Sequence, residues 1–351
     1  MMKLAVLMIG IAACAVGQTS PVATIPRYRG QLSSDDARYV TGMNYDPVDA
    51  PFAWLPTNEI LIGHSEDYSS ADVFARTCAG SGFYWVSLTT GVTRAVAVGE
   101  PACEAASAHD GAAADPQGHW IVFAMNVPIN RSGLFKLFLS TNNIDTLPTG
   151  CRIYHDQPAV SADGRFIAGR GLCRDRNEDY YRIYVTAADG SGLRAVSTSD
   201  SAGDEMPAWS PDGRRIAFQR SRGEPGDRIE EISIQDLDGS HRRSLTRGGS
   251  PAWSPDGQWI AFLSRASRGY EQTLRIIRPD GRDERVVFES KESGTYSRGW
   301  GPVPEGLPYG PLMWSPDSRW IAFTRRFDAG SSVWRVDIAT SHLVRVTAPD
   351  R

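Results

Sequence analysis

Acidic side chains recur at one position of the sequence, two residues ahead of six similar short segments. The position is acidic in the first four segments and is occupied by Gly249 and Tyr309 in the last two. In three segments the residue before it is also ionisable. We call these seven residues the acidic arc: Asp49, Asp110, Asp156 and Glu205, together with His109, His155 and Asp204.

If the six segments are arranged in a ring, these positions surround the mouth of its central channel. Carboxylates gathered around such a narrow opening repel one another, and a lowered dielectric strengthens this repulsion. Other groups must therefore compensate their charge. Internal partners are the first candidates, and Arg220 and Arg325 stand at suitable places in the segments that follow. The other candidates are a bound divalent cation, which oxygen and imidazole groups would suit as ligands, and a basic peptide. The residue types favour internal partners and leave the other two open.

No other motif for catalysis or cofactor binding accompanies the acidic arc. The sequence contains no HExxH, no phosphate-binding loop, no dinucleotide fingerprint after a strand and no GxSxG. The formal net charge of −4 gives no electrostatic case for nucleic-acid binding. The remaining histidines are isolated, and we expect them at the surface or within strands: His64, His119, His241 and His342.

The segments behind the acids are copies of one repeat. The two clearest copies run from Pro207 to Phe218 and from Pro251 to Phe262, and both begin Pro-Ala-Trp-Ser-Pro-Asp-Gly. A third copy covers 313–323, a fourth covers 158–169, and two weaker copies cover 112–123 and 51–62. The tryptophan position recurs at intervals of 44 to 61 residues, at Trp54, Ala114, Val160, Trp209, Trp253 and Trp314.

Each repeat is predicted to form four antiparallel strands, which we name A to D. Strand A ends on the tryptophan, a large apolar surface for packing. Ser-Pro-Asp-Gly is a tight turn with a structural aspartate, because Pro fixes φ, Asp bonds nearby backbone and Gly accepts a positive φ. An apolar strand B follows, and a Gly-bearing hairpin joins strands C and D. A spacing of 44 to 61 residues fits one four-stranded propeller blade with loop insertions. We therefore predict an all-β, six-bladed β-propeller with four-stranded antiparallel blades.

The repeated phrase resembles the PD40, or WD40-like, repeat of TolB-type β-propellers. The resemblance covers about 300 residues and implies the same fold, although that propeller hosts many roles. It does not include the α/β domain of TolB, because only about 30 residues separate the predicted leader from Pro51. Related propellers of S9 serine peptidases carry an appended hydrolase, for which this sequence has no nucleophile motif.

Residues 1–17 are predicted to be a signal peptide, because Lys3 precedes an apolar run too short to cross a bilayer. Cleavage after Gly17 would release a soluble periplasmic or secreted protein. The alternative is a lipobox ending at Cys14, whose acylation would anchor the protein to a membrane. Residues 18–50 then form an N-terminal extension, and residues 51–351 form the propeller, with no transmembrane segment.

Four cysteines lie outside the leader, and an even number in an exported chain favours disulfides over metal or redox chemistry. In an antiparallel blade, strand A begins at the same end where strand B finishes. Cys103 and Cys151 precede strand A of the second and third blades, whereas Cys78 and Cys173 follow strand B of the first and third. We therefore expect the pairs Cys78–Cys103 and Cys151–Cys173, each worth about 3 kcal/mol in the chain-entropy model.

The longest insertions open onto this same end of the blades, which we call the mouth end. Long loops on a rigid scaffold are where function concentrates. Trp300 and Tyr309, in the insertion 289–310, are predicted to contact a ligand there together with the acidic arc. We predict an exported, monomeric binding or scaffold protein, without a cofactor, that engages a protein or cell-envelope component. The alternative is a lyase or glycoside hydrolase that uses these acids with His109 or His155.

Overall fold

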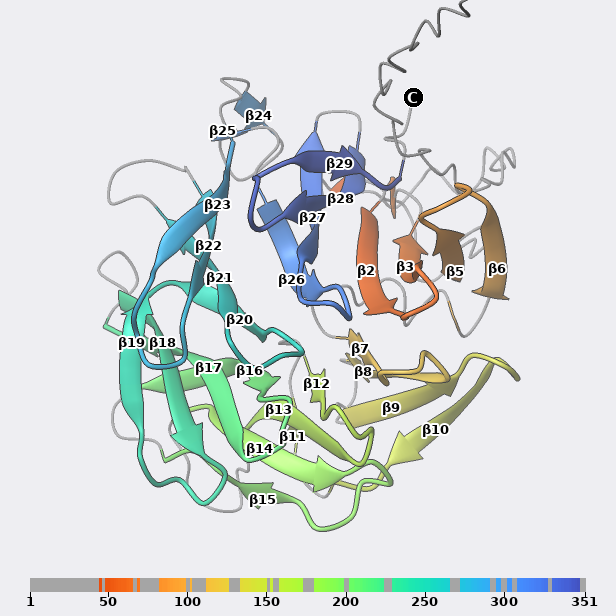
Figure 1. Cartoon of the computed structure of the whole chain (residues 1–351). Helices are drawn as coiled ribbons and strands as arrows, with labels where there is room; N and C mark the ends of the chain where they lie inside the picture. The colour runs from red at the N-terminus through yellow and green to blue at the C-terminus, as the bar shows by residue number, and fades with distance from the viewer. Residues whose placement is uncertain are drawn as a thin grey trace, which may run out of the picture.

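The computed structural model shows β-sheets arranged as a ring around a central axis (Figure 1). The elements that it describes are the strands β1 to β29. In the described part of the chain, no helix is long and apolar enough to cross a membrane. The described residues are 44–45, 48–65, 68–69, 82–98, 102, 112–125, 133–149, 152–153, 158–172, 180–198, 202–223, 229–265, 272–290, 295–297, 302–304, 308–327 and 330–347.

Each blade is one antiparallel sheet made from one repeat, with strands A to D in sequence order from the axis outward. Blade 1 contains β2 (Val48–Trp54), β3 (Glu59–Ser65), β5 (Gly82–Ser87) and β6 (Thr93–Val98). Blade 2 contains β7 (Ala112–Ala114), β8 (Trp120–Met125), β9 (Gly133–Phe138) and β10 (Asn143–Leu147). Blade 3 contains β12 (Ala159–Val160), β13 (Phe166–Leu172), β14 (Arg182–Ala187) and β15 (Arg194–Ala195).

The other three blades repeat this arrangement. Blade 4 contains β16 (Gly203–Trp209), β17 (Arg215–Arg222), β18 (Ile229–Asp236) and β19 (Arg243–Arg247). Blade 5 contains β20 (Gly249–Trp253), β21 (Ile260–Arg265), β22 (Gln272–Ile277) and β23 (Arg285–Glu289). Blade 6 contains β26 (Pro308–Trp314), β27 (Trp320–Phe327), β28 (Gly330–Asp337) and β29 (Leu343–Arg345). The predicted six-bladed propeller is thus confirmed.

Short strands supplement the blades at the mouth end. β1 (Asn44–Tyr45) pairs with β4 (Tyr68–Ser69), and β24 (Thr295–Ser297) pairs with β25 (Pro302–Pro304). β11 (Arg152–Ile153) pairs with the far end of β13, so β11 and β12 are two halves of strand A of blade 3. Strand A is also irregular in blade 4, where the register shifts between Glu205 and Ala208 around Met206, which has a φ of 54°.

The ring closes by contact between the first and last blades. The innermost strands touch one another in the order β2, β7, β12, β16, β20, β26 and back to β2. At this closing seam, Thr324 Oγ1 donates to the carbonyl oxygen of Asp49 (2.8 Å), and the amide of Asp49 donates to Ser331 Oγ (3.0 Å). Each four-stranded sheet of the described residues uses one continuous stretch of chain, so none of these sheets combines strands from the first and the last blade. The seam is therefore held by side-chain packing and by these hydrogen bonds.

The hydrophobic core is divided among the interfaces between blades. In the described residues it forms six clusters, and each draws its buried side chains from two neighbouring blades. Each of the six repeats places an isoleucine near the start of strand B, and these side chains are at most 1% exposed: Ile60, Ile121, Ile167, Ile216, Ile260 and Ile321. A single blade cannot bury its apolar faces alone, which is why neighbouring blades must stack.

The tryptophan position ends strand A in every blade, as the repeat predicts: Trp54, Ala114, Val160, Trp209, Trp253 and Trp314. In two blades the indole reaches the preceding blade. Nε1 of Trp209 donates to the carbonyl oxygen of Ala159, and Nε1 of Trp314 donates to that of Ala252, both at 3.0 Å. Nε1 of Trp253 is buried without an acceptor among the described residues.

This difference predicts unequal losses on substitution by phenylalanine. Trp209→Phe leaves the carbonyl of Ala159 without its donor, whereas Trp253→Phe removes an indole N–H that already lacks an acceptor. We expect Trp209→Phe to lower the free energy of unfolding by about 1–3 kcal/mol more than Trp253→Phe. Urea denaturation of the two variants measures the difference. Equal losses would show that the hydrogen bond between blades contributes nothing.

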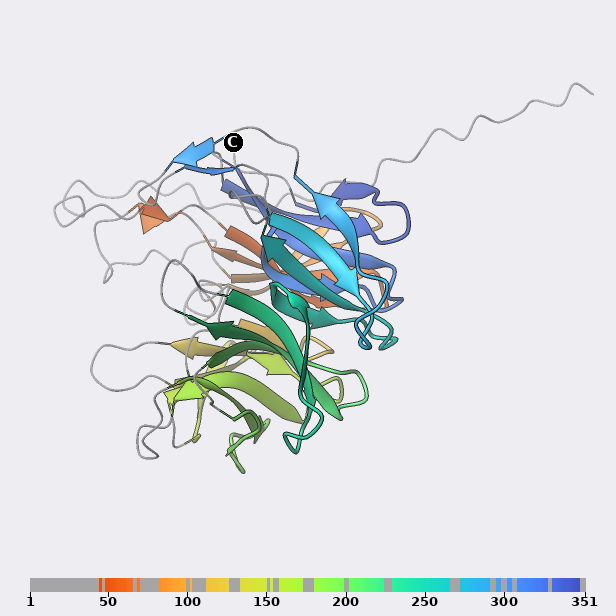
Figure 2. The same ribbon diagram turned by 90° about the vertical axis from the view of Figure 1, so that its left-hand side faces the viewer.

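The Ser-Pro-Asp-Gly turn between strands A and B supplies its own hydrogen bonds. In blade 4, Asp212 accepts from Ser210 Oγ (2.6 Å) and from the amide of Arg214 (3.1 Å), while Ser210 Oγ accepts from the amide of Arg215 (2.9 Å). Gly213 follows with a φ of 68°. The same bonds form around Asp163, Asp256 and Asp317. These turns and the C–D hairpins lie at the end opposite the mouth (Figure 2).

Candidate functional site

At the mouth end of blade 4, two acids of the arc lie side by side on β16 and face partners on β17. Asp204 is opposite Arg220 in the antiparallel register, and Glu205 is opposite Gln219. Nη1 of Arg220 donates to Oδ1 of Asp204 at 2.8 Å, and the two side chains are 4% and 0% exposed. The internal partner that the sequence suggested for this arginine is thus present.

Glu205 links two blades. Its Oε2 accepts from Nη1 of Arg170 on β13 of blade 3 at 3.0 Å. Its Oε1 accepts from Nε2 of Gln219 (3.0 Å) and from Oγ of Ser221 (2.9 Å), both on β17. The guanidinium of Arg170 also lies 4.2 Å from the ring centre of Tyr181. Both oxygens of Glu205 are therefore engaged, and the carboxylate holds the mouth ends of blades 3 and 4 together.

The first acid of the arc, Asp49, lies buried at the closing seam. Its Oδ1 is 2.7 Å from Nδ1 of His64, which is opposite it on β3. Asp49 is 4% exposed and His64 is fully buried. His64 is a strand residue, as expected, but it is paired with an acid rather than isolated. This aspartate therefore anchors the seam through its main chain and orients an imidazole through its side chain.

The pairing of Arg170 with Glu205 and of His64 with Asp49 was not expected from the sequence. A signal for the second pair exists, because directly opposed residues of a hairpin are neighbours. The pairing of Asp49 with His64 follows once the register of β2 and β3 is known. The first pair joins two blades, so it depends on how the blades stack, and no local pattern encodes that.

Arg325, the second suggested partner for the acids, has aromatic neighbours. Its guanidinium lies 4.7 Å from the ring centre of Trp334 and 5.1 Å from that of Phe288 on the neighbouring blade. Guanidinium groups are attracted to aromatic faces at such distances. This arginine therefore contributes to the contact between blades 5 and 6.

The rest of the predicted site is not tested by the structure. Tyr309 lies in β26 opposite Thr324, and only its backbone is described. In the ranges that the structure describes, no three His, Cys, Asp or Glu side chains form a group that could hold a metal ion. The remaining predicted residues lie outside the described residues, and their roles stay predictions: His109, Asp110, His155, Asp156, Trp300, Cys14, Cys78, Cys103, Cys151 and Cys173.

Burial dominates the electrostatics of the Asp204–Arg220 pair. It raises the pKa of Asp204 to about 7, and the nearby Glu205 carboxylate adds to the rise, while a Ser197 hydrogen bond and the charge of Arg242 oppose it. Burial also lowers the pKa of Arg220 to about 10. Both pKa shifts have the same main cause, because burial removes water from the charged form of each group.

The raised pKa of Asp204 predicts how stability depends on pH. The folded protein keeps this proton up to about pH 7, whereas an unfolded chain releases it near pH 4. The free energy of unfolding should therefore fall as pH rises between about 4 and 7, by at most about 1.4 kcal/mol per pH unit for one proton. Asp204→Asn should remove this component of the slope. Urea denaturation at several pH values tests it, and an unchanged slope in the variant would contradict the assignment.

Comparison with known proteins agrees with this architecture. No family model matches the chain. Over 79 residues it is 33% identical to the Tol-Pal system protein TolB of Thioalkalivibrio sulfidiphilus, which is 22% of this chain and 17% of that protein's length. Among solved structures, TolB from Acinetobacter baumannii aligns with a TM-score of 0.52 at 12% identity, over 87% of this chain and 65% of that chain. The chain shares its propeller fold with TolB.

A second structural relative is an enzyme. An oligogalacturonate lyase in complex with manganese aligns with a TM-score of 0.50 at 11% identity, over 88% of this chain and 86% of that chain. Identities this low show a common fold, and one fold supports many functions. TolB-like architecture is therefore established for this chain, while its activity must be argued from its own residues.

Proposed function

We propose that this TolB-like propeller is an exported binding or scaffold protein that engages a protein or another cell-envelope component at the mouth end. The observation that carries the proposal is the ionic network of blades 3 and 4. Arg170, Glu205, Arg220 and Asp204 fix one another across two blades beneath the rim. Both carboxyl groups are buried, and both oxygens of Glu205 and Oδ1 of Asp204 accept hydrogen bonds, so these groups are suited to hold a surface in shape rather than to react with a substrate.

The rim above this network offers charged groups for a partner. Nη2 of Arg222 donates to Oε2 of Glu231 at 2.8 Å, and these side chains are 53% and 23% exposed. An exposed ion pair contributes little to stability, about 0–1 kcal/mol. Its groups are therefore available to contact another molecule at small cost to the fold. Charged rims of this kind steer association and set specificity.

The relatives add support for the place of action. The matched TolB sequence is described as a Tol-Pal system protein, and the predicted leader would export the present chain. We therefore place the protein in the periplasm, with secretion or a lipid anchor at Cys14 as the alternatives, and we expect it to act as a monomer.

Site-specific crosslinking in the native host tests the proposal. A photo-crosslinking amino acid at position 222 is at the mouth end, and one at position 282 is in an exposed turn at the opposite end. We expect one defined envelope component to be captured from position 222 and not from position 282. Equal capture from both positions, or none from position 222, would reject binding at the mouth.

An activity screen addresses the competing enzyme hypothesis. Purified protein with its metal content measured would be incubated with polysaccharides, and binding predicts no turnover. Turnover that is abolished by Asp156→Asn would overturn the scaffold proposal and support a lyase or glycoside hydrolase.

A further inference from the structure

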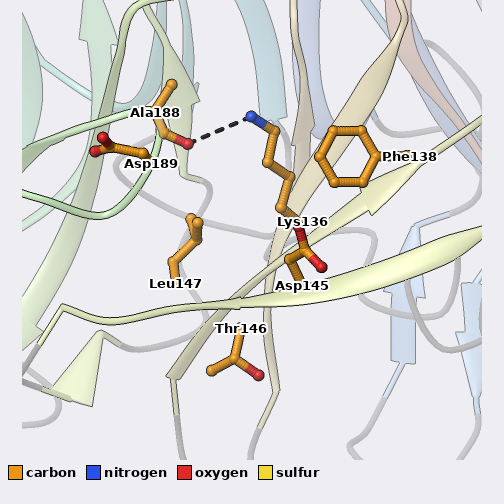
Figure 3. Close-up of a pocket in the computed structure, with 7 residues that line it drawn as sticks. All are labelled: Lys136, Phe138, Asp145, Thr146, Leu147, Ala188 and Asp189. Carbon is orange, nitrogen blue, oxygen red and sulfur yellow. Dashed lines mark hydrogen bonds between the residues drawn. The ribbon is translucent and has the colours of Figure 1, made fainter.

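A pocket of about 510 Å³ lies on the outer wall of the ring, between the outer strands of blade 2 and the C–D hairpin of blade 3. Its lining combines apolar side chains with three charged ones (Figure 3). The lining residues are Lys136 and Phe138 of β9, Asp145, Thr146 and Leu147 of β10, and Ala188 and Asp189 of the hairpin.

The hairpin of blade 3 is seated tightly against β10, so the pocket has a fixed wall. Gly190 has a φ of 85°, and a Cβ at this position would lie 2.8 Å from Cδ of Pro148 and 3.1 Å from Cβ of Leu147. Only glycine allows this approach without a shift of the neighbouring chain. Nζ of Lys136 also donates to the carbonyl oxygen of Ala188 at 3.3 Å, which ties the wall to blade 2.

The cation of the pocket is already engaged. The ammonium group of Lys136 lies 4.0 Å from the ring centre of Trp120 and 5.3 Å from that of Phe138. Burial lowers the pKa of Lys136, while the charges of Asp115, Asp145 and Asp189 act to raise it. The lysine therefore forms part of the wall rather than a free cation at the opening.

The two carboxylates at the opening remain available to a ligand. Asp145 and Asp189 are both exposed. Oδ1 of Asp189 accepts from the amide of Ser191 at 2.9 Å, and Ser191 lowers the pKa of this carboxyl group. Asp145 forms no hydrogen bond or ion pair with the residues that the structure describes. Two carboxylates against one ammonium give the lining a net negative charge, which complements a cationic ligand.

The pocket also adjoins a free strand edge. β10 is the last strand of its sheet and pairs only with β9 in the described structure. An extended peptide can add to such an edge through main-chain hydrogen bonds, and pockets then select alternate side chains. Asp145 and Leu147 point to the same face of β10, since side chains alternate along a strand. One side chain of an added strand would thus reach the pocket.

We propose that this pocket binds an arginine side chain carried by an extended peptide segment of a partner protein, which pairs with the free edge of β10. The planar guanidinium matches carboxylates through paired N–H donors and stacks on aromatic faces such as Phe138. This site is separate from the mouth end, so one protein could engage two partners or two segments of one partner.

The test uses a fluorescent peptide of alternating threonine and valine with one central arginine, and the same peptide with citrulline in its place. We expect the arginine peptide to bind the full chain at least about tenfold more tightly. The double variant Asp145→Asn/Asp189→Asn should abolish this preference. Asp238→Asn is the matched control, because Asp238 caps the equivalent turn of blade 4 by accepting from the amide of Ser240 at 2.8 Å.

Lysine acetylation localises the binding. The chain has three lysines, Lys3, Lys136 and Lys291, so mass spectrometry can follow each one. The arginine peptide should slow acetylation of Lys136 and leave Lys291 unchanged. Equal affinity for both peptides, a preference that survives in the double variant, or protection of Lys291 alone would overturn the proposal. Because crosslinking from position 222 probes the other end of the ring, failure here would leave the mouth-end function standing.

Discussion

Replacing Arg220 by methionine is expected to lower the free energy of unfolding by about 3–5 kcal/mol, because the Asp204 carboxyl group then stays buried without its cation. Asp204 is completely buried and Arg220 is 4% exposed, so water cannot take over the lost partner. The loss should be larger at pH 8 than at pH 5. Burial raises the pKa of Asp204 to about 7, and at the lower pH the carboxyl group avoids the penalty by keeping its proton. Urea denaturation at both pH values measures these losses.

Two further variants separate this effect from a general loss of charge. Arg222→Met removes a neighbouring arginine whose side chain is 53% exposed, and it should cost only about 0–1 kcal/mol. The double variant Asp204→Leu/Arg220→Met should recover most of the stability, since apolar replacements of buried ion pairs are often neutral or stabilising. If Arg220→Met were as mild as Arg222→Met, the buried pair would have no structural role.

The fold could be predicted because it is repeated. A tryptophan at the end of strand A, a Ser-Pro-Asp-Gly turn and an apolar strand B recur in the sequence. The structure places each in the expected element, as with Trp209, Asp212 and Ile216. Turn chemistry and periodicity act within a few residues, so they can be read locally. The number of copies then gave the number of blades.

The partners of the acidic arc could be predicted only in part. Arg220 was expected near the acids because it follows strand B, and it pairs with Asp204. Arg325 occupies the equivalent place in blade 6, where its guanidinium lies near the rings of Phe288 and Trp334. The residues opposite the two arginines differ, because β26 carries Pro308 opposite Arg325, whereas β16 carries Asp204 opposite Arg220. Irregularities of strand A, such as the positive φ of Met206, shift this register and cannot be located from composition.

The closure of the ring could not be predicted either, because it depends on contacts between the two ends of the propeller. The seam brings β2 against β26, β27 and β28, and its cluster combines side chains such as Ile60 and Val333. Every other interface joins blades that are neighbours in the chain. When one of those interfaces opens, the chain still connects its two blades, whereas at the seam only contacts between distant segments hold the two blades together.

This asymmetry predicts different behaviour for two chemically identical variants. Ile60→Ala at the seam and Ile216→Ala between blades 3 and 4 each remove a fully buried side chain, and each should lower the free energy of unfolding by about 2–5 kcal/mol. Only Ile60→Ala should also accelerate hydrogen exchange selectively in β2 and in β26 to β28, because the weakened seam opens while the other blades stay stacked.

Hydrogen exchange with peptide-level mass analysis distinguishes the two cases. For Ile216→Ala, the expected increase is confined to blades 3 and 4 or follows global unfolding. A uniform increase over all blades in Ile60→Ala would mean that the propeller unfolds as one cooperative unit. The seam would then be as strong as the interfaces that chain continuity supports, and Thr324, Ser331 and the buried Asp49–His64 pair would suffice to make it so.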